Sequence, residues 1–173
     1  MVELTSIFGL TETLAIIVGV IIALQQLGDI KQTRETELET RQAQLFMNIY
    51  NQGFTNPQFL EAMLTVSHLH WESLEEYQAL LDYTNPETRN NRLAMTMLIG
   101  FYEGVGVLVK ENLLDIRMVA LLMTGPMKSF WEKLEPIVEE RREYRNYPRW
   151  VSETEYLYNE LMKYISEHPE FKV

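Results

Sequence analysis

No cysteine occurs in this sequence of 173 residues. This absence excludes disulfide bonds, cysteine-ligated zinc and a thiol nucleophile. Glycine and proline are also scarce, at 8 and 6 residues, too few for a β-sandwich with many tight turns. The alternation of apolar and polar residues that marks a half-buried strand is weak throughout. The sequence therefore predicts an all-α fold, with enough residues for one domain with its own core.

Basic residues are outnumbered by acidic ones, 15 to 25, which gives a formal net charge of −10. A protein that binds nucleic acid by counterion release needs a basic face. Eight of the 15 basic residues lie between Lys110 and Arg149, but glutamates are interleaved with them. We therefore expect no nucleic-acid partner, and we expect the acidic surface to keep the protein soluble.

No pattern typical of an active site or a metal site is present. The sequence lacks GxSxG, HExxH and paired-aspartate motifs. His68 and His70 are two residues apart and would point to different sides of a helix, so they form no chelating pair. Gly100 and Gly104 share a helix face without the lysine of a phosphate loop, and we expect them to permit close helix packing. We predict no catalytic residue, cofactor or metal ligand.

The longest apolar segment lies near the N-terminus, where residues 7–27 read IFGLTETLAIIVGVIIALQQL. As a helix this segment is about 31 Å long, close to the thickness of a bilayer's hydrocarbon core. Its apolar side chains favour insertion by about 4–7 kcal/mol, against a cost of about 2.5–3.5 kcal/mol for a charge such as Glu12 at the midplane. We therefore predict a membrane anchor at residues 1–28. The alternative is a buried core helix of a soluble protein.

The orientation of this anchor follows from the positions of basic residues. No lysine or arginine precedes the span, whereas Lys31, Arg34 and Arg41 follow it. By the positive-inside rule, the N-terminus lies outside and the following domain is cytoplasmic.

One face of the predicted span carries small residues with a polar residue at each end. Glu12, Ala15, Gly19, Ala23 and Gln26 fall on this face at 100° per residue. Small residues let two membrane helices approach closely, and polar ends can hydrogen-bond across the pair. We expect self-association through this face. The alternative is that alanine and glycine, common in spanning helices, align there by chance.

A polar segment and then an apolar, helix-rich region follow the span. Residues 29–44 predict a solvated helical stalk with two (i, i+4) ion pairs and one (i, i+3) pair. Residues 45–173 predict a cytoplasmic bundle of about five to six helices. We expect helix starts at Asn56-Pro57, near Ser73 and at Asn85-Pro86.

The helix that follows Asn85-Pro86 should run to about Asn112 and form the centre of the bundle, with Leu93 among its inward residues. After it we expect helices at 115–123 and 126–142, separated by Gly125-Pro126, with a kink or a restart at Pro136. The last helix should open at Pro148 and end at His168-Pro169.

Glu103 is an acidic residue in the most apolar of these helices. A buried carboxylate needs a partner or a shifted pKa. Arg141 or Arg142 could supply that partner as a structural ion pair. Alternatively, Glu103 could line a pocket.

Two segments, FYEGVGVLVKENLLD at 101–115 and FWEKLEPIVEERR at 130–142, stand out together with a later Trp150. In this order they resemble a family of small prokaryotic single-pass membrane proteins, the domain of unknown function numbered 4760. The matching positions are Phe101, Tyr102, Glu103, Gly106, Leu108, Val109, Trp131, Leu134, Pro136 and Arg142. The resemblance implies a membrane-tethered helical domain and brings no established activity.

Three functions remain open from the sequence. The first is a membrane-tethered interaction, scaffold or sensor module, with the lipid bilayer, a second copy of the chain or another protein as partner. The second is an enzyme of unrecognised type with a polar site around Glu103 and Arg142. The third is a soluble helical protein with its first helix buried.

Overall fold

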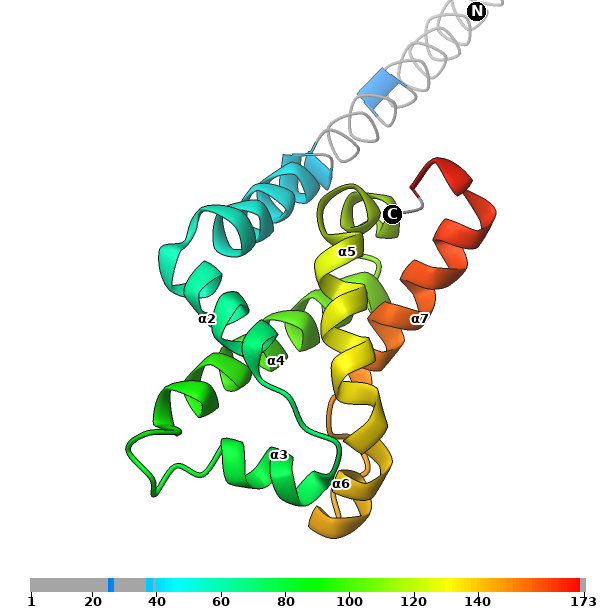
Figure 1. Cartoon of the computed structure of the whole chain (residues 1–173). Helices are drawn as coiled ribbons and strands as arrows, with labels where there is room; N and C mark the ends of the chain where they lie inside the picture. The colour runs from blue at the N-terminus through cyan, green and yellow to red at the C-terminus, as the bar shows by residue number, and fades with distance from the viewer. Residues whose placement is uncertain (1–24, 27–36, 39, 172–173) are drawn as a thin grey trace, which may run out of the picture. The chain divides into compact units, whose positions relative to one another are not determined.

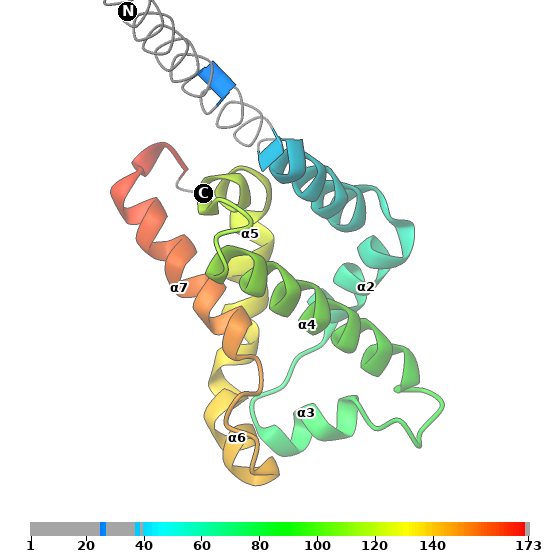
Figure 2. The same ribbon diagram turned by 180° about the vertical axis from the view of Figure 1, so that it is seen from behind.

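The computed structural model describes residues 25–26, 37–38 and 40–171. The chain divides between Ala43 and Gln44 into two units, and the description below concerns the second. All regular structure in the described residues is helical (Figures 1 and 2). This confirms the expected all-α class.

The second unit begins with helical residues 44–50 and continues through a series of helices and short turns. Its elements are η1 (Asn51–Thr55), α2 (Pro57–His68), α3 (Leu74–Leu80), α4 (Arg89–Lys110), α5 (Ile116–Leu134), η2 (Glu135–Ile137), α6 (Val138–Arg145), α7 (Ser152–Glu167) and η3 (Pro169–Phe171).

Two helix starts follow the local chemistry of the sequence. Asn56 precedes α2, and its side chain accepts hydrogen bonds from the backbone N–H groups of Gln58 and Phe59 at 3.0 and 3.4 Å. Ser73 does the same for α3 by accepting from the N–H of Glu76 at 3.2 Å. Both side chains satisfy N–H groups that have no partner within their helix. The predicted starts at these positions are confirmed.

The predicted start at Asn85-Pro86 is wrong, because these residues form a turn. The Asn85 side chain accepts from the N–H of Glu87 at 3.0 Å, and α4 begins only at Arg89. An asparagine that bonds to the backbone two residues ahead builds an Asx turn as readily as a helix cap.

The prolines at 126 and 136 act differently from one another. The predicted separation of two helices near Gly125-Pro126 is found slightly upstream: α5 consists of two helical parts that meet at a kink at Met123, whose backbone is not helical (φ −138°, ψ 23°). Proline lacks the N–H that would bond to the carbonyl four residues earlier, so the helix gives way upstream of the ring. At Pro136 the chain forms η2 and restarts as α6, which agrees with the predicted restart.

Helix α4 forms the centre of the unit and packs between α2 and α7, while α7 also packs on α5 (Figures 1 and 2). Its buried residues are Ala94, Met95, Leu98, Tyr102, Val105, Gly106 and Val109. Leu93, expected to point inward, is 58% exposed. Among the described residues, α4 is also the one helix long and apolar enough to cross a membrane, but its position between α2 and α7 is that of a core helix.

The last helix, α7, begins later than predicted. Pro148 lies in a turn, and the helix starts at Ser152 after Val151, which has a left-handed backbone with φ 53°. A β-branched residue in this conformation is strained. The helix ends at Glu167, immediately before His168-Pro169, as expected.

Candidate functional site

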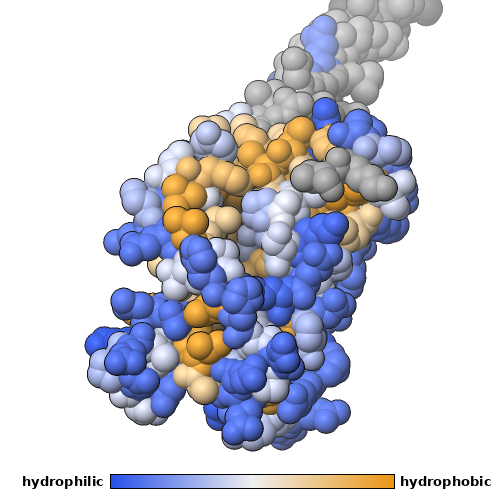
Figure 3. All heavy atoms as spheres, in the orientation of Figure 1, coloured by the Kyte–Doolittle hydropathy of each residue, from blue (hydrophilic) through white to orange (hydrophobic). Residues whose placement is uncertain are grey.

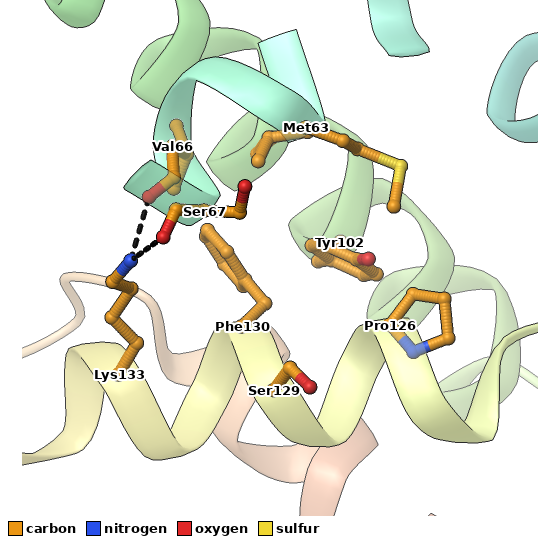
Figure 4. Close-up of a pocket in the computed structure, with 9 residues that line it drawn as sticks. Met63, Val66, Ser67, Tyr102, Pro126, Ser129, Phe130 and Lys133 are labelled. Atoms are coloured by element: carbon orange, nitrogen blue, oxygen red, sulfur yellow. Dashed lines mark hydrogen bonds between the residues drawn. The ribbon is translucent and has the colours of Figure 1, made fainter. Parts of the chain in front are cut away.

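A cavity of about 470 Å³ lies between α2, α4 and α5 (Figure 4). Its lining residues are Met63, Val66, Ser67, Leu98, Tyr102, Pro126, Ser129, Phe130 and Lys133. The volume falls within the range of small-molecule sites, about 300–1,000 Å³. Most of the lining is apolar, and the polar groups are two serine hydroxyls, a phenol and an ammonium.

Helical spacing explains how these residues come to line one cavity. On α5, Pro126, Ser129, Phe130 and Lys133 stand at i, i+3, i+4 and i+7, which places them on one face. Residues at the same spacing on α2 and α4 complete the walls. Ser129 is exposed, so it lies at the mouth of the cavity.

Tyr102 forms a wall of the cavity and is only 2% exposed. Its ring stacks on Phe130, with ring centroids 4.8 Å apart, and meets Phe101 edge-on at 5.3 Å. Burial raises the pKa of Tyr102, so the phenol is neutral and can donate a proton. The hydroxyl is drawn on the side of the cavity where Met63 and Pro126 lie (Figure 4). No described residue forms a hydrogen bond with it.

Lys133 closes the opposite end of the cavity from Pro126 (Figure 4). Its ammonium donates to the carbonyl oxygens of Val66 and Ser67 at 2.7 and 2.8 Å, where α2 ends. It also lies 5.4 Å from the centre of the Trp71 ring. Burial lowers the pKa of Lys133, while the negative end of the α2 dipole favours its charge. An ammonium has three N–H donors, and the third has no acceptor among the described residues.

Sequence reasoning did not find this cavity. The signal was present in α5, where Ser129 and Lys133 are polar residues on a face shared with Phe130. A lysine on the inner face of an amphipathic helix, with a serine at the edge of that face, is an exception to the usual pattern. The cavity itself forms only because α2 and α4 pack against that face of α5.

Glu103, the acidic residue predicted to need a partner, has one, but it is not an arginine. Its Oε1 accepts hydrogen bonds from the backbone N–H and the hydroxyl of Thr154 at 2.6 and 2.8 Å. Thr154 lies in the first turn of α7, a helix whose own preceding residues provide no side-chain cap. Glu103 therefore caps α7 from α4, and its carboxylate is favoured there by the helix dipole.

Arg142 also forms hydrogen bonds with residues around the start of α7. Its guanidinium donates to the carboxylates of Glu139 and Glu155, each at 2.7 Å, and to the carbonyl oxygen of Trp150 at 3.1 Å. Within the described part of the chain, neither Arg141 nor Arg142 forms an ion pair with Glu103. The predicted ion pair is therefore wrong. Glu103 and Arg142 instead form separate hydrogen bonds with residues around the start of α7.

Arg141 points elsewhere, against aromatic rings. Its guanidinium carbon lies 5.2 Å from the centre of the Tyr77 ring and 4.5 Å from that of Trp150. These contacts hold the side chain in a hollow on the α3 and α6 side of the unit.

The predicted self-association face lies almost wholly outside the described residues. Glu12, Ala15, Gly19 and Ala23 are not described, and Gln26 is helical and exposed. The predicted span at 7–27, apart from residues 25–26, and most of the stalk at 29–44 likewise lie outside them. No group of three or more histidines and carboxylates within the described ranges is placed to hold a metal ion.

Comparison with known families identifies the chain. A family model described as a domain of unknown function, DUF4760, matches residues 13–161, so the chain belongs to that family. The resemblance seen in the two sequence segments and Trp150 is thereby confirmed. No curated protein and no solved structure matches the chain.

Proposed function

We propose that this member of the DUF4760 family is a membrane-tethered sensor module whose helical unit binds a small apolar acid. The observation that carries the proposal is the cavity of about 470 Å³ between α2, α4 and α5. Cavities of this size with apolar walls and a few convergent polar groups are the usual form of a small-molecule site.

The composition of the cavity favours a ligand with one apolar part and one anionic end. Phe130, Leu98 and Met63 offer apolar surface to the body of the ligand. Lys133 has one N–H donor left beside the two that bind α2, and a carboxylate would accept it in a charge-assisted bond. Such an anion would also stabilise the ammonium, whose pKa is lowered by burial.

The tether rests on the amino-acid sequence. Residues 7–27 are long and apolar enough to span a bilayer, and the basic residues after them favour a cytoplasmic position for the helical unit. A sensor on this side of the membrane would meet small acids dissolved in the cytoplasm.

The alternative of an enzyme around Glu103 and Arg142 gains no support from these residues. Oε1 of Glu103 and the guanidinium of Arg142 form hydrogen bonds with residues around the start of α7. Neither lines the cavity.

The proposal is tested by thermal unfolding of the full chain in lipid nanodiscs with 4-phenylbutyrate and with its neutral amide. Ligand that binds only the folded state at a hundredfold excess over Kd should raise Tm by about 5–10 °C. We expect this rise with the carboxylate and a much smaller one with the amide, because only the carboxylate pairs with Lys133. Ser129→Trp should abolish the rise by filling the mouth of the cavity.

The matched control is Ser166→Trp, which adds the same side chain at an exposed position of α7 and should leave the rise intact. An equal rise in Ser129→Trp, or no rise in the wild-type chain, would contradict the proposal.

A further inference from the structure

At the end of the unit where α3 and α6 lie, away from the start of α5 (Figures 1 and 2), there is a second concave region. It consists of two hollows of about 390 and 270 Å³ that share Tyr77, Leu81, Arg92 and Arg141. The face in Figure 3 is largely hydrophilic at this end. None of the shared residues lines the cavity between α2, α4 and α5.

Three arginines line the larger hollow: Arg92 from α4, and Arg141 and Arg145 from α6. In the described part of the chain none of the three forms an ion pair. Arg92 donates one long hydrogen bond, 3.4 Å, to the carbonyl of Leu81, and Arg145 lies over the ring of Tyr144. In a protein with a net charge of −10, three arginines free of carboxylate partners at one place are unusual.

Arg141 is the best positioned of the three. The rings of Tyr77 and Trp150 hold its guanidinium, but ring contacts accept none of its five N–H donors in ordinary hydrogen bonds. No described residue accepts one either. Arg142, the next residue on α6, has two carboxylates and a carbonyl. The two adjacent arginines of α6 therefore differ: the guanidinium of Arg142 has hydrogen-bond acceptors, whereas that of Arg141 has only aromatic rings beside it.

The electrostatics of the hollow agree with this geometry. Burial lowers the pKa of Arg141, and the positive charges of Arg145 and Arg92 lower it further, against the effect of Tyr77. Glu75 and Asp82 also line the hollow. Both are exposed, and the Asp82 carboxylate accepts from the N–H and hydroxyl of Thr84 at 2.9 and 2.8 Å. The three cations are therefore close to one another and outnumber the two carboxylates of the hollow, and neither carboxylate forms an ion pair with them.

We propose that this hollow binds the phosphate of an organic phosphomonoester, with Arg92, Arg141 and Arg145 donating to the phosphate oxygens. A dianionic phosphate suits several guanidinium groups better than a single carboxylate, because it has more charge and more acceptor oxygens. The smaller hollow, which continues past Arg141 along Met95, Ile99 and Trp150, takes the apolar or aromatic part of the ligand.

The test is calorimetric titration of the full chain in phosphatidylcholine nanodiscs with phenyl phosphate. We expect saturable binding, and weaker binding of inorganic phosphate, which lacks the ring. Arg145→Gln should weaken the affinity for phenyl phosphate by about tenfold or more, the effect of one charge-assisted hydrogen bond. Arg145 is exposed, so this variant keeps its fold. Arg141→Gln should have a larger effect, with circular dichroism confirming that it is folded.

The matched control is Arg117→Gln, which removes the same charge from an exposed position at the start of α5 and should bind as the wild type does. The proposal is overturned if phenyl phosphate does not bind, if Arg145→Gln binds equally well, or if Arg117→Gln loses as much affinity.

A further arm identifies the source of the phosphate. If the natural ligand is a lipid headgroup, phosphatidic acid in the nanodisc should compete with phenyl phosphate, whereas phosphatidylglycerol at the same content should not. If the ligand is a soluble phosphomonoester, neither lipid should compete. Both results uphold a phosphomonoester site. Equal competition by the two lipids would instead indicate unspecific charge attraction and would count against it.

Discussion

Gly106 lies where α4 packs directly on the first turn of α7. A Cβ atom at this position would come within 2.7 Å of the backbone carbon of Glu153 and even closer to its carbonyl oxygen. Backbone atoms cannot move aside as the tip of a side chain can. The glycine therefore permits an approach of the two helices that any larger residue would prevent.

Gly106→Ala should lower the free energy of unfolding by about 1–3 kcal/mol, the usual cost of overpacking, despite alanine's better helix propensity. Gly104→Ala is the matched control on the same helix. Its Cβ would meet nothing within 4 Å, so it should stabilise the fold by about 0.5–1 kcal/mol. Urea denaturation of both variants measures the difference. Equal effects would show that close packing at Gly106 contributes nothing.

The sequence predicted the wrong glycines for this contact. Gly100 and Gly104 share a helix face, but that face is exposed, and open space surrounds both. The spacing of residues along a helix shows which of them share a face. Which other helix covers that face depends on the tertiary structure. Glu103 is similar: its need for a partner could be predicted, but Thr154 lies 51 residues away on another helix.

The helix boundaries also differ in whether local residues or distant ones determine them. The starts of α2 and α3 could be predicted because Asn56 and Ser73 cap them locally. The start of α7 could not, because it is fixed by Glu103 from α4 and follows Val151 in a strained conformation. Pro148 was predicted to start the helix, but it lies in a turn.

The α4–α7 junction also contains a titratable pair. Lys110, at the end of α4, donates to both carboxylate oxygens of Glu153 at 2.8 and 3.1 Å. This hydrogen bonding lowers the pKa of Glu153. The pair therefore stabilises the fold above the ordinary pKa of a glutamate, and the contribution is lost as the pH falls through the lower pKa of the folded state.

Lys110→Met should lower the free energy of unfolding by about 1 kcal/mol at pH 7, since Lys110 is half-exposed and solvent screens the pair. The loss should shrink below the folded pKa of Glu153, where only the contact of Lys110 with the Tyr156 ring remains to be removed. Urea denaturation at pH 7 and at a pH below the folded pKa of Glu153 measures both. Lys128→Met, which breaks an exposed pair with Glu132 at 4.0 Å, should change little at either pH. A loss from Lys110→Met that is independent of pH would exclude the titrating pair as its cause.

The concave sites of the unit are the part that the sequence could not predict. The cavity takes its walls from α2, α4 and α5, and the arginine-lined hollow from α3, α4 and α6. Arg141 was singled out as a partner for Glu103, but its true setting depends on Tyr77, 64 positions earlier. Helical class and several boundaries are local properties, whereas a site shared by three helices depends on how they pack.

Every buried apolar residue in the described part of the chain lies between Ile49 and Ile165, within the second unit. A unit of this size buries enough surface to fold alone. We therefore expect residues 44–173 to be helical by circular dichroism, with a Tm within about 3 °C of that of the full chain. If residues 7–27 span the bilayer as predicted, the full chain should stay in the pellet in carbonate extraction of membranes, and residues 44–173 should be released.

Ile17→Lys in the full chain is the informative variant. It places a charge at the centre of the predicted span, at a cost of about 2.5–3.5 kcal/mol, which removes much of the margin for insertion. This variant should appear in the supernatant while its Tm matches that of residues 44–173. Release of the unaltered full chain into the supernatant would contradict the proposed membrane anchor. Loss of helical structure on removing residues 1–43 would instead favour the alternative in which the first helix is part of the core.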